Sequence, residues 1–307
     1  MRALRWTTGS ALVLTYGLIV LGAWVRATGS GLSCPDWPTC YGHWVPLPGD
    51  IPTDVGYSYL QVMLEWVHRL IAGVILGPLV LVIGFLAWRA RGTRPRMPAY
   101  AGGLILLLLV QAGLGGLTVL DQNSPWSVAL HLGTALVLLS VLCLIFERTG
   151  QASHHVAIAP RTLCSVTWLL ALGAMVSAAM VAKTGAALAC STSWPLCDGA
   201  LLPDLGDPQI RLHFTHRLLA LGVGLGLLAL TIVAREAGIG PLARLATALV
   251  AVEIGLGAAV VLGEVPFGTA LAHQALGVLV FAILSAIMWR AHGRTPDREI
   301  AHGLSHA

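Results

Sequence analysis

The chain has 307 residues, of which 56% are hydrophobic and only 10% are charged, and its mean hydropathy is +0.80. Soluble domains carry about 25% charged residues, so this composition excludes a soluble globular protein and predicts an integral membrane protein. The formal net charge of +4 is small and gives no reason to expect a nucleic-acid partner.

Apolar segments long enough to cross a bilayer recur along the chain. A membrane-spanning helix needs about 20 apolar residues, and no segment alternates polar and apolar residues as a barrel strand does. The first segment follows Arg2 and Arg5 as a signal peptide would, but we expect it to be retained because a later segment repeats it. We predict eight membrane-spanning helices, at residues 8–27, 60–88, 99–120, 127–147, 162–183, 211–234, 242–262 and 269–290.

The loops at the two ends of these predicted helices differ in charge. The loops at residues 28–59, 121–126, 185–210 and 263–268 contain no lysine or arginine. By the positive-inside rule, we predict a multi-pass protein of the cell (plasma) membrane with both termini cytoplasmic and these four loops outside. The basic residues that define the cytoplasmic side are Arg2, Arg5, Arg89, Arg91, Arg94, Arg96, Arg148, Arg161, Arg235, Arg244, Arg290, Arg294 and Arg298.

The two halves of the chain repeat each other in the same order. The aligned segments are "VRATGSGLSC" (25–34) with "VAKTGAALAC" (181–190), "HRLIAGVILGPLVL" (68–81) with "HRLLALGVGLGLLA" (216–229), "QAGLGGLTVL" (111–120) with "EIGLGAAVVL" (253–262), and "LHLGTALVLL" (130–139) with "AHQALGVLVF" (272–281). We therefore predict an all-α membrane protein of two tandem, parallel-oriented four-helix bundles. The first unit is residues 1–150 and the second is residues 151–307, which ends in a short cytoplasmic tail.

The repeat places four histidines at matched depth inside the membrane. His68 and His216 lie on the second helix of each unit, and His131 and His273 lie on the fourth. Ionisable side chains in a membrane are costly and suggest function, and two histidines on facing helices can ligate a haem iron from both sides. Zinc, which needs three or four protein ligands, fits a pair less well. A hydrogen-bonded packing role is the alternative. We expect six other histidines in loops or the tail: His43, His154, His155, His292, His302 and His306.

Charged side chains beside these histidines differ between the units. Glu65 precedes His68 by three residues and so shares its helix face, whereas His213 takes that place in the second unit. This difference suggests that one unit does chemistry and the other carries electrons. Arg69 and Arg217 directly follow the histidines, and they either pair with haem propionates or extend toward the membrane surface.

Further polar residues open to two interpretations lie along the spans. Arg26 and Lys183, just below the cysteine loops, have the same two alternatives as the arginines above. Gln111 and Glu253 occupy aligned positions deep in the third and seventh helices. We expect Glu253 to bond to a neighbouring helix rather than to form a proton route. The glycines at 113, 115, 116, 255 and 257 are expected to allow close approach of a helix or a macrocycle.

Two cysteine pairs lie in the loops predicted to be outside. Disulfides persist outside the cytoplasm, so we predict the bridges Cys34–Cys40 and Cys190–Cys197. Each is either a structural bridge that closes its loop over the helix bundle or an exchangeable disulfide that accepts electrons from an external thiol. The two other cysteines, Cys143 and Cys164, are predicted to be buried within the spans.

Taken in order, these motifs resemble the haem A synthase family over essentially the whole chain. The resemblance is carried by "GLSCPDWPTC" (31–40), "EWVHR" (65–69), "HLGTA" (131–135), "THRLLA" (215–220) and "AHQALG" (272–277). It implies a membrane oxidoreductase that oxidises the C8 methyl group of haem O to a formyl group through hydroxylated intermediates. The product would be the haem A of terminal oxidases. Haem O synthase, oxidase assembly factors and an external thiol or quinone are candidate partners.

The resemblance also assigns roles to individual residues. His68 and His131 would hold the substrate haem O in the first unit, and His216 and His273 would ligate a resident haem B in the second. Glu65 matches the family's acidic residue, and we expect it to act as a base or to stabilise charge. Cys34 and Cys40 match a pair with a catalytic role in the family. Arg69 and Arg217 are the candidate propionate partners.

Two other functions use the same residues. A di-haem b-type electron-transfer cytochrome would need the four histidines but no difference between Glu65 and His213. A membrane thiol oxidase would depend on the cysteine loops and tolerate loss of the histidines. A transporter is disfavoured because no broken helix occurs at matching positions in the two halves.

Overall fold

The computed structural model describes residues 1–150, 158–234 and 238–293, and within these residues the regular secondary structure is helical. Among the described residues, eight helical segments are long and apolar enough to cross a membrane, as predicted. The second is one continuous span made of several pieces. The segments are α1 (Arg2–Ala27), the span of α2 (Tyr59–Leu70), a π-helical turn (Ile71–Leu76) and α3 (Gly77–Arg89), then α4 (Met97–Leu120), α5 (Pro125–Thr149), α6 (Ile158–Thr184), α7 (Pro208–Val233), α8 (Gly240–Leu262) and α9 (Phe267–Ala291). The protein is a multi-pass membrane protein.

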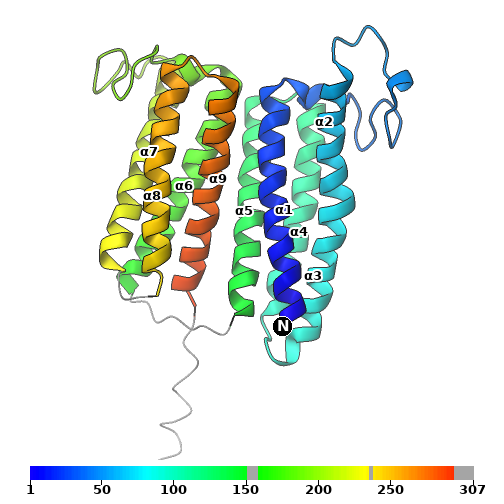
Figure 1. Ribbon diagram of the computed structural model, residues 1–307, viewed down its shortest axis with the longest axis vertical. Coiled ribbons are helices and arrows are strands. Elements are labelled where there is room, and N and C mark those ends of the chain that lie inside the picture. Colours follow the sequence, from blue (N-terminus) through cyan, green and yellow to red (C-terminus); the bar gives the residue numbers. More distant parts are fainter. Residues whose placement is uncertain (151–157, 235–237, 294–307) are drawn as a thin grey trace, which may run out of the picture.

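The helices gather into two groups that pack side by side (Figure 1). One buried core lies among α1, α3, α4 and α5, and a second lies mainly among α6, α7, α8 and α9. Between them, α5 packs against α6 and α9, and α1 packs against α9. This arrangement is consistent with the two predicted four-helix units, and the line of contact is called the seam below. The predicted junction falls mostly at 151–157 and the predicted tail at 294–307, so both lie outside the described residues, as do His154, His155, His302 and His306.

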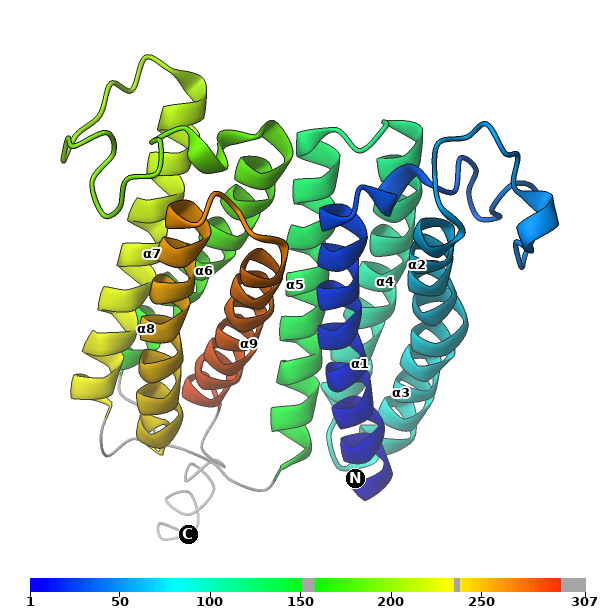
Figure 2. The ribbon, with the colours of Figure 1, turned by 45° about the horizontal axis from the view of Figure 1, so that its top comes forward.

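Both cysteine loops lie at the same end of the bundle, opposite Met1 (Figure 2). This end is called the disulfide end below. The structure contains both predicted bridges, Cys34–Cys40 and Cys190–Cys197. The free cysteines Cys143 and Cys164 are buried in the spans, as expected.

Local sequence determines where the histidine-bearing helices begin. Ser58 caps α2 by accepting from the backbone N–H of Gln61, whose side chain in turn accepts from the backbone N–H of Ser58. Asp207 caps α7 by accepting from two backbone N–H groups of the first turn. These caps place His68 and His216 at similar distances from the disulfide end.

The π-helical turn distinguishes the second span of the first unit from α7. Pro78 has no N–H to donate, and its ring crowds the preceding turn of an α-helix. The chain widens over Ile71–Leu76 just before this proline. The aligned residue in α7 is Gly226, and α7 continues as an α-helix through it. The irregular turn therefore lies next to His68 only, where π-helical turns are often functional.

Candidate functional site

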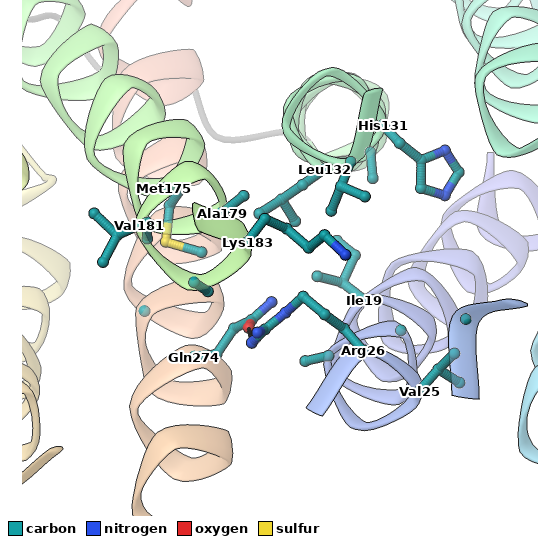
Figure 3. A pocket seen from close by; sticks show the side chains of 18 of the residues that line it. Ile19, Val25, Arg26, His131, Leu132, Met175, Ala179, Val181, Lys183 and Gln274 are labelled. Carbon is teal, nitrogen blue, oxygen red and sulfur yellow. Dashed lines mark hydrogen bonds between the residues drawn. The ribbon is translucent and has the colours of Figure 1, made fainter. Parts of the chain in front are cut away.

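A cavity of about 1220 Å³ extends across both units. Pockets for drug-sized ligands measure roughly 300–1,000 Å³, so this cavity has room for a ligand the size of a macrocycle. Figure 3 shows part of it at the seam, between α1, α5, α6 and α9. Its walls include His68, His131, His216 and His273, together with Glu65, Arg69 and Arg217.

In the second unit, both histidine rings are held through Nδ1. Nδ1 of His216 lies 3.0 Å from the carbonyl oxygen of Ala174 and 3.2 Å from Oγ of Ser177. A carbonyl can only accept, so this nitrogen carries the proton and Nε2 is left with its lone pair. Nδ1 of His273 lies 3.0 Å from Oε1 of Glu253, an ion-pair distance at which the ring N–H is not aligned on the oxygen. Such partners orient a metal-ligating histidine.

The rings of the first unit are held differently. Nδ1 of His68 is buried and has no hydrogen-bond partner among the described residues. The residue aligned with Ser177 is Leu21, which cannot accept a hydrogen bond through its side chain. His131 faces the amide nitrogen of Gln111, 3.1 Å from Nδ1 and 3.3 Å from Nε2. Among the described residues, Nδ1 of His68 therefore has no carbonyl or carboxylate oxygen as a partner, unlike Nδ1 of His216.

Glycines lie against the histidine rings. A Cβ atom on Gly115 would lie 3.2 Å from Cε1 of His131, and one on Gly257 would lie 3.0 Å from Cε1 of His273. A Cβ on Gly22 would lie 3.3 Å from Cε1 of His68. These distances are at or inside the limit of ordinary packing, so a side chain at any of the three would press on a ring. The prediction of close approach holds for Gly115 and Gly257.

Three other glycines in these predicted runs have different surroundings. A Cβ on Gly116 would lie 3.2 Å from the ring of Trp37 in the first cysteine loop. Nothing lies within 4 Å of the position that a Cβ would take at Gly113 or Gly255. Close packing of a neighbouring helix therefore does not explain the glycines at these last two positions.

The donor set fits haem better than a single metal ion. Within the described chain, no group of three or more His, Cys, Asp or Glu side chains could hold a metal ion. Two histidines from facing helices in each unit, with glycines beside the rings and a large cavity between them, suit an iron bound in a flat macrocycle. The buried, unpartnered Nδ1 of His68 is further reason to expect a bound group here.

Arg69 connects the histidine helix to the first cysteine loop. Its Nε donates to Oε1 of Glu65 at 2.9 Å. Its Nη1 donates to the carbonyl oxygens of Asp36 at 2.5 Å and Thr39 at 2.9 Å, and its Nη2 donates to that of Cys34 at 3.1 Å. The guanidinium thus fastens the loop over α2. Sequence reasoning missed this role because loop carbonyls leave no mark in a sequence.

Arg217 repeats this arrangement in the second unit. Its Nε donates to Nε2 of His213 at 3.1 Å, and its Nη atoms donate to the carbonyl oxygens of Ser193, Pro195 and Leu196 at 3.0–3.2 Å. The Nη groups of each arginine are therefore hydrogen-bonded to backbone carbonyls of a disulfide loop. The arginine's partner on the histidine helix differs between the units: it is a carboxylate, Glu65, in the first and an imidazole, His213, in the second.

Asp36 organises the first cysteine loop. Its carboxylate accepts from the hydroxyl of Thr39 and from the backbone N–H groups of Tyr41 at 2.6 Å and Gly42 at 3.0 Å. Partial burial acts to raise the pKa of Asp36, but these hydrogen bonds outweigh it, and the pKa lies below its ordinary value of 3.8. The loop is thus held by a charged aspartate as well as by its disulfide.

Tryptophans from both loops cover the cavity at the disulfide end. Trp37, Trp44 and Trp194 are among the lining residues. Nε1 of Trp66 on α2 donates to the carbonyl oxygen of Trp44 at 2.7 Å, which holds that part of the loop down. The four disulfide cysteines do not line the cavity. The loops therefore act as a cover whose bridges lie behind the cavity wall.

Comparison with known proteins shows the family of this chain. The family model COX15-CtaA, described as cytochrome oxidase assembly protein, matches residues 5–285. The chain belongs to this family. The resemblance seen in the sequence motifs is therefore confirmed at the level of the family.

Curated relatives of this family resemble the chain over almost its whole length. Heme A synthase of Shewanella oneidensis is 29% identical, over 95% of this chain and 98% of the relative. Heme A synthase of Symbiobacterium thermophilum is 30% identical, over 94% of this chain and 95% of the relative. Heme A synthase of Geobacillus kaustophilus is 28% identical, over 100% of this chain and 98% of the relative.

Gln111 and Glu253, the aligned polar residues of the third and seventh membrane helices, each contact a histidine. Oε1 of Glu253 on α8 lies 3.0 Å from Nδ1 of His273 on α9, so this side chain contacts a neighbouring helix, as expected. Gln111 on α4 reaches His131 on α5 in the same way. Their aligned positions in the repeat were the signal that could have paired them with the aligned histidines.

Proposed function

We propose that this protein is a haem A synthase, a membrane oxidoreductase that converts the C8 methyl group of haem O to a formyl group through hydroxylated intermediates. Family membership and the relatives named Heme A synthase support this activity. Neither comparison favours a di-haem electron carrier or a thiol oxidase. The histidine-lined cavity inside the membrane suits a substrate that, being apolar, partitions into lipid.

The observation that carries the assignment of the two units is the contrast between their Nδ1 partners. Oxygen atoms on Nδ1 of His216 and His273 preorient both rings, which suits a resident haem B that stays bound in the second unit, residues 151–307. Nδ1 of His68 lacks such an oxygen among the described residues, which suits a substrate haem O that enters and leaves the first unit, residues 1–150. The resident haem would supply one-electron transfer.

Glu65 is the residue we assign to proton removal at the substrate. It and Glu253 are the carboxylates among the lining residues, and Glu253 is engaged with His273. Oxidation of a methyl group releases protons, and a positioned carboxylate can accept them. Arg69 holds Oε1 of Glu65, and within the described chain the other oxygen accepts no hydrogen bond. Cys34 and Cys40 hold the loop to which Arg69 is fastened, so we assign them to positioning of this base.

The orientation in the membrane follows from charge. We infer that the disulfide end faces outward from the cell membrane and that both chain ends are cytoplasmic. The loops at the disulfide end contain no lysine or arginine, whereas the connection between α3 and α4, which lies at the opposite end in Figure 2, contains Arg91 and Arg94. This asymmetry supports the orientation. An outward disulfide end also places the bridges where disulfides persist.

Haem analysis of the purified protein tests the proposal. Protein made in cells that supply haem O should yield haem B together with haem A or its alcohol precursor, identified by chromatography with mass detection. Glu65→Gln should lower the oxidised products by roughly 100-fold or more, whereas His213→Gln, at the aligned position, should not. Recovery of haem B alone at two per chain would contradict the proposal, as would full product from Glu65→Gln.

A further inference from the structure

Two cations meet at the seam near the disulfide end. Arg26 lies in the last turn of α1, and Lys183 lies in the last turn of α6. Both line the cavity. Figure 3 shows their side chains pointing from the two units into the same space, together with Gln274 of α9. The cations are brought together only because the two units pack as they do.

These cations have no acidic partner in the described chain. Nη2 of Arg26 donates to Oε1 of Gln274 at 3.0 Å, and its other N–H groups have no hydrogen-bond acceptor among the described residues. Lys183 has no hydrogen bond or ion pair there. No described Asp or Glu oxygen lies within 4.0 Å of either side chain. Two unpaired positive charges beside a largely apolar cavity are costly unless an anion joins them.

The arginines that follow the histidines are poorly placed to serve this purpose. Arg69 and Arg217 each donate to three backbone carbonyls of a disulfide loop, besides their contact to residue 65 or 213. Binding an anion would require them to release those loops. Among the described residues, Arg26 has N–H donors without an acceptor, and none of the N–H donors of Lys183 has an acceptor. The cavity's available positive charge is therefore at the seam.

We propose that Arg26 and Lys183 form a carboxylate-binding site that receives the propionate groups of the haem that enters the first unit. This rests on the proposed function and deepens it. The guanidinium offers a planar fork that matches a carboxylate, and the ammonium offers a mobile point charge for a second carboxylate. Ile19, Leu132 and Met175 beside them provide apolar contact for the macrocycle (Figure 3). Binding at the seam orients the macrocycle with its carboxylates toward the disulfide end.

A pair of porphyrins that differ only in these carboxylates tests the site. The holoprotein is purified from cells that make no haem O, so that by the proposed function the first unit is free. It is titrated with ferric protoporphyrin IX and, separately, with its dimethyl ester, and binding is followed by the absorbance of bis-histidine iron. The wild type should bind the free acid at least about tenfold more tightly than the ester, since each charged hydrogen bond contributes about that factor.

Matched variants assign the discrimination to the seam. Arg26→Gln and Lys183→Gln should each weaken binding of the free acid about tenfold and leave ester binding unchanged. Lys183→Arg should retain most of the preference. Arg211→Gln removes an exposed cation on α7 that does not line the cavity, and it should change neither affinity. Gln274→Leu removes only the neutral partner of Arg26 and should have the smaller effect.

The outcomes separate this proposal from the function on which it rests. Equal affinity of the wild type for acid and ester overturns the carboxylate site but leaves the haem-binding function standing. The same holds if both glutamine variants keep the preference. A wild type that binds neither porphyrin overturns both. A change in the resident-haem spectrum would reveal misfolding of a variant, and in that case Lys183→Arg and the wild-type acid-to-ester ratio decide the result.

Discussion

Nε of Arg69 donates to Oε1 of the buried Glu65 at 2.9 Å, one helical turn away on α2. In the second unit, Nε of Arg217 donates to His213 at 3.1 Å in the same relative position. The two units thus share an arginine that fastens a disulfide loop, but only the first unit places an acid behind it. The loop of the first unit and its proposed base are therefore mechanically connected.

Replacing each arginine in turn separates its attachment of the loop from its effect on Glu65. Arg69→Gln should release the loop carbonyls and remove the counter-charge of Glu65, and we expect formation of oxidised haem to fall by about 100-fold. Arg217→Gln should loosen only the second loop and lower activity much less. Arg69→Lys should restore part of the activity, because it returns the charge without the fork. Product analysis and hydrogen exchange of the loop amides measure the two effects.

Particular outcomes would contradict this connection. If Arg217→Gln reduced product formation as much as Arg69→Gln, loop attachment alone would explain the loss, and Glu65 would have no special dependence on its arginine. If Arg69→Gln left exchange of the Tyr41 and Gly42 amides unchanged, the loop would not depend on the guanidinium.

The residue beside the fourth-helix histidine should set the reduction potential of the resident haem. A carboxylate near Nδ1 of His273 makes the ring a stronger electron donor to iron and favours the oxidised state. Glu253→Gln should therefore raise the midpoint potential, by about 60 mV for a tenfold change in the ratio of reduced to oxidised haem. Optical redox titration of protein from cells without haem O measures this. Gln111→Glu is the control, because it changes the other unit.

An unchanged potential in Glu253→Gln would show that the 3.0 Å contact with His273 is not kept when haem is bound. A shift of similar size but opposite sign in Gln111→Glu would place the measured haem in the first unit and would reverse the proposed assignment of the units.

Most of the fold was accessible from the sequence because lipid imposes simple rules. Apolar length predicted all eight spans, but it placed the first at residues 8–27, whereas α1 begins at Arg2. Hydropathy detects the lipid-exposed part, and a helix can continue beyond it with polar residues. The irregular turn at Ile71–Leu76 was missed, since Pro78 signals a disturbed helix without specifying which form it takes.

The sequence predicted the part of the site whose residues recur at matched positions of the repeat. Matched positions identified four histidines that line one cavity, and they separated Glu65 from His213. The loop contacts of Arg69 and Arg217, and the meeting of Arg26 with Lys183 across the seam, depend on tertiary packing between segments far apart in the chain. Neither periodicity nor spacing encodes such contacts.

The first cysteine loop should loosen in acid. Because the pKa of folded Asp36 lies below its ordinary value, its stabilising effect is complete above the ordinary pKa and is lost as the pH falls through the lowered value. Hydrogen exchange at the amides of Tyr41 and Gly42 should rise over that range, after correction for intrinsic rates. Asp36→Asn should abolish this pH dependence. Exchange in the wild type that stays constant through the acid range would contradict the role of the charge.

Two glycines on α8, two residues apart, provide a final test of the histidine geometry. A Cβ on Gly257 would lie 3.0 Å from Cε1 of His273, whereas nothing lies within 4 Å of a Cβ on Gly255. Gly257→Ala should therefore displace the ring and reduce the resident haem per chain by about tenfold or more, the usual effect of disturbing a ligand's support. Gly255→Ala should keep full haem content and stabilise the helix by up to about 1 kcal/mol.

The same pair of positions exists on α4 for the first unit. Gly115→Ala should press on His131, from which its Cβ would lie 3.2 Å, and Gly113→Ala should not. We expect Gly115→Ala to lose haem O oxidation while retaining haem B, and Gly257→Ala to lose haem B. Haem extraction with mass detection measures both. Loss of haem B in Gly115→Ala, with retention in Gly257→Ala, would show that the resident haem lies between His68 and His131 and that the second unit receives the substrate.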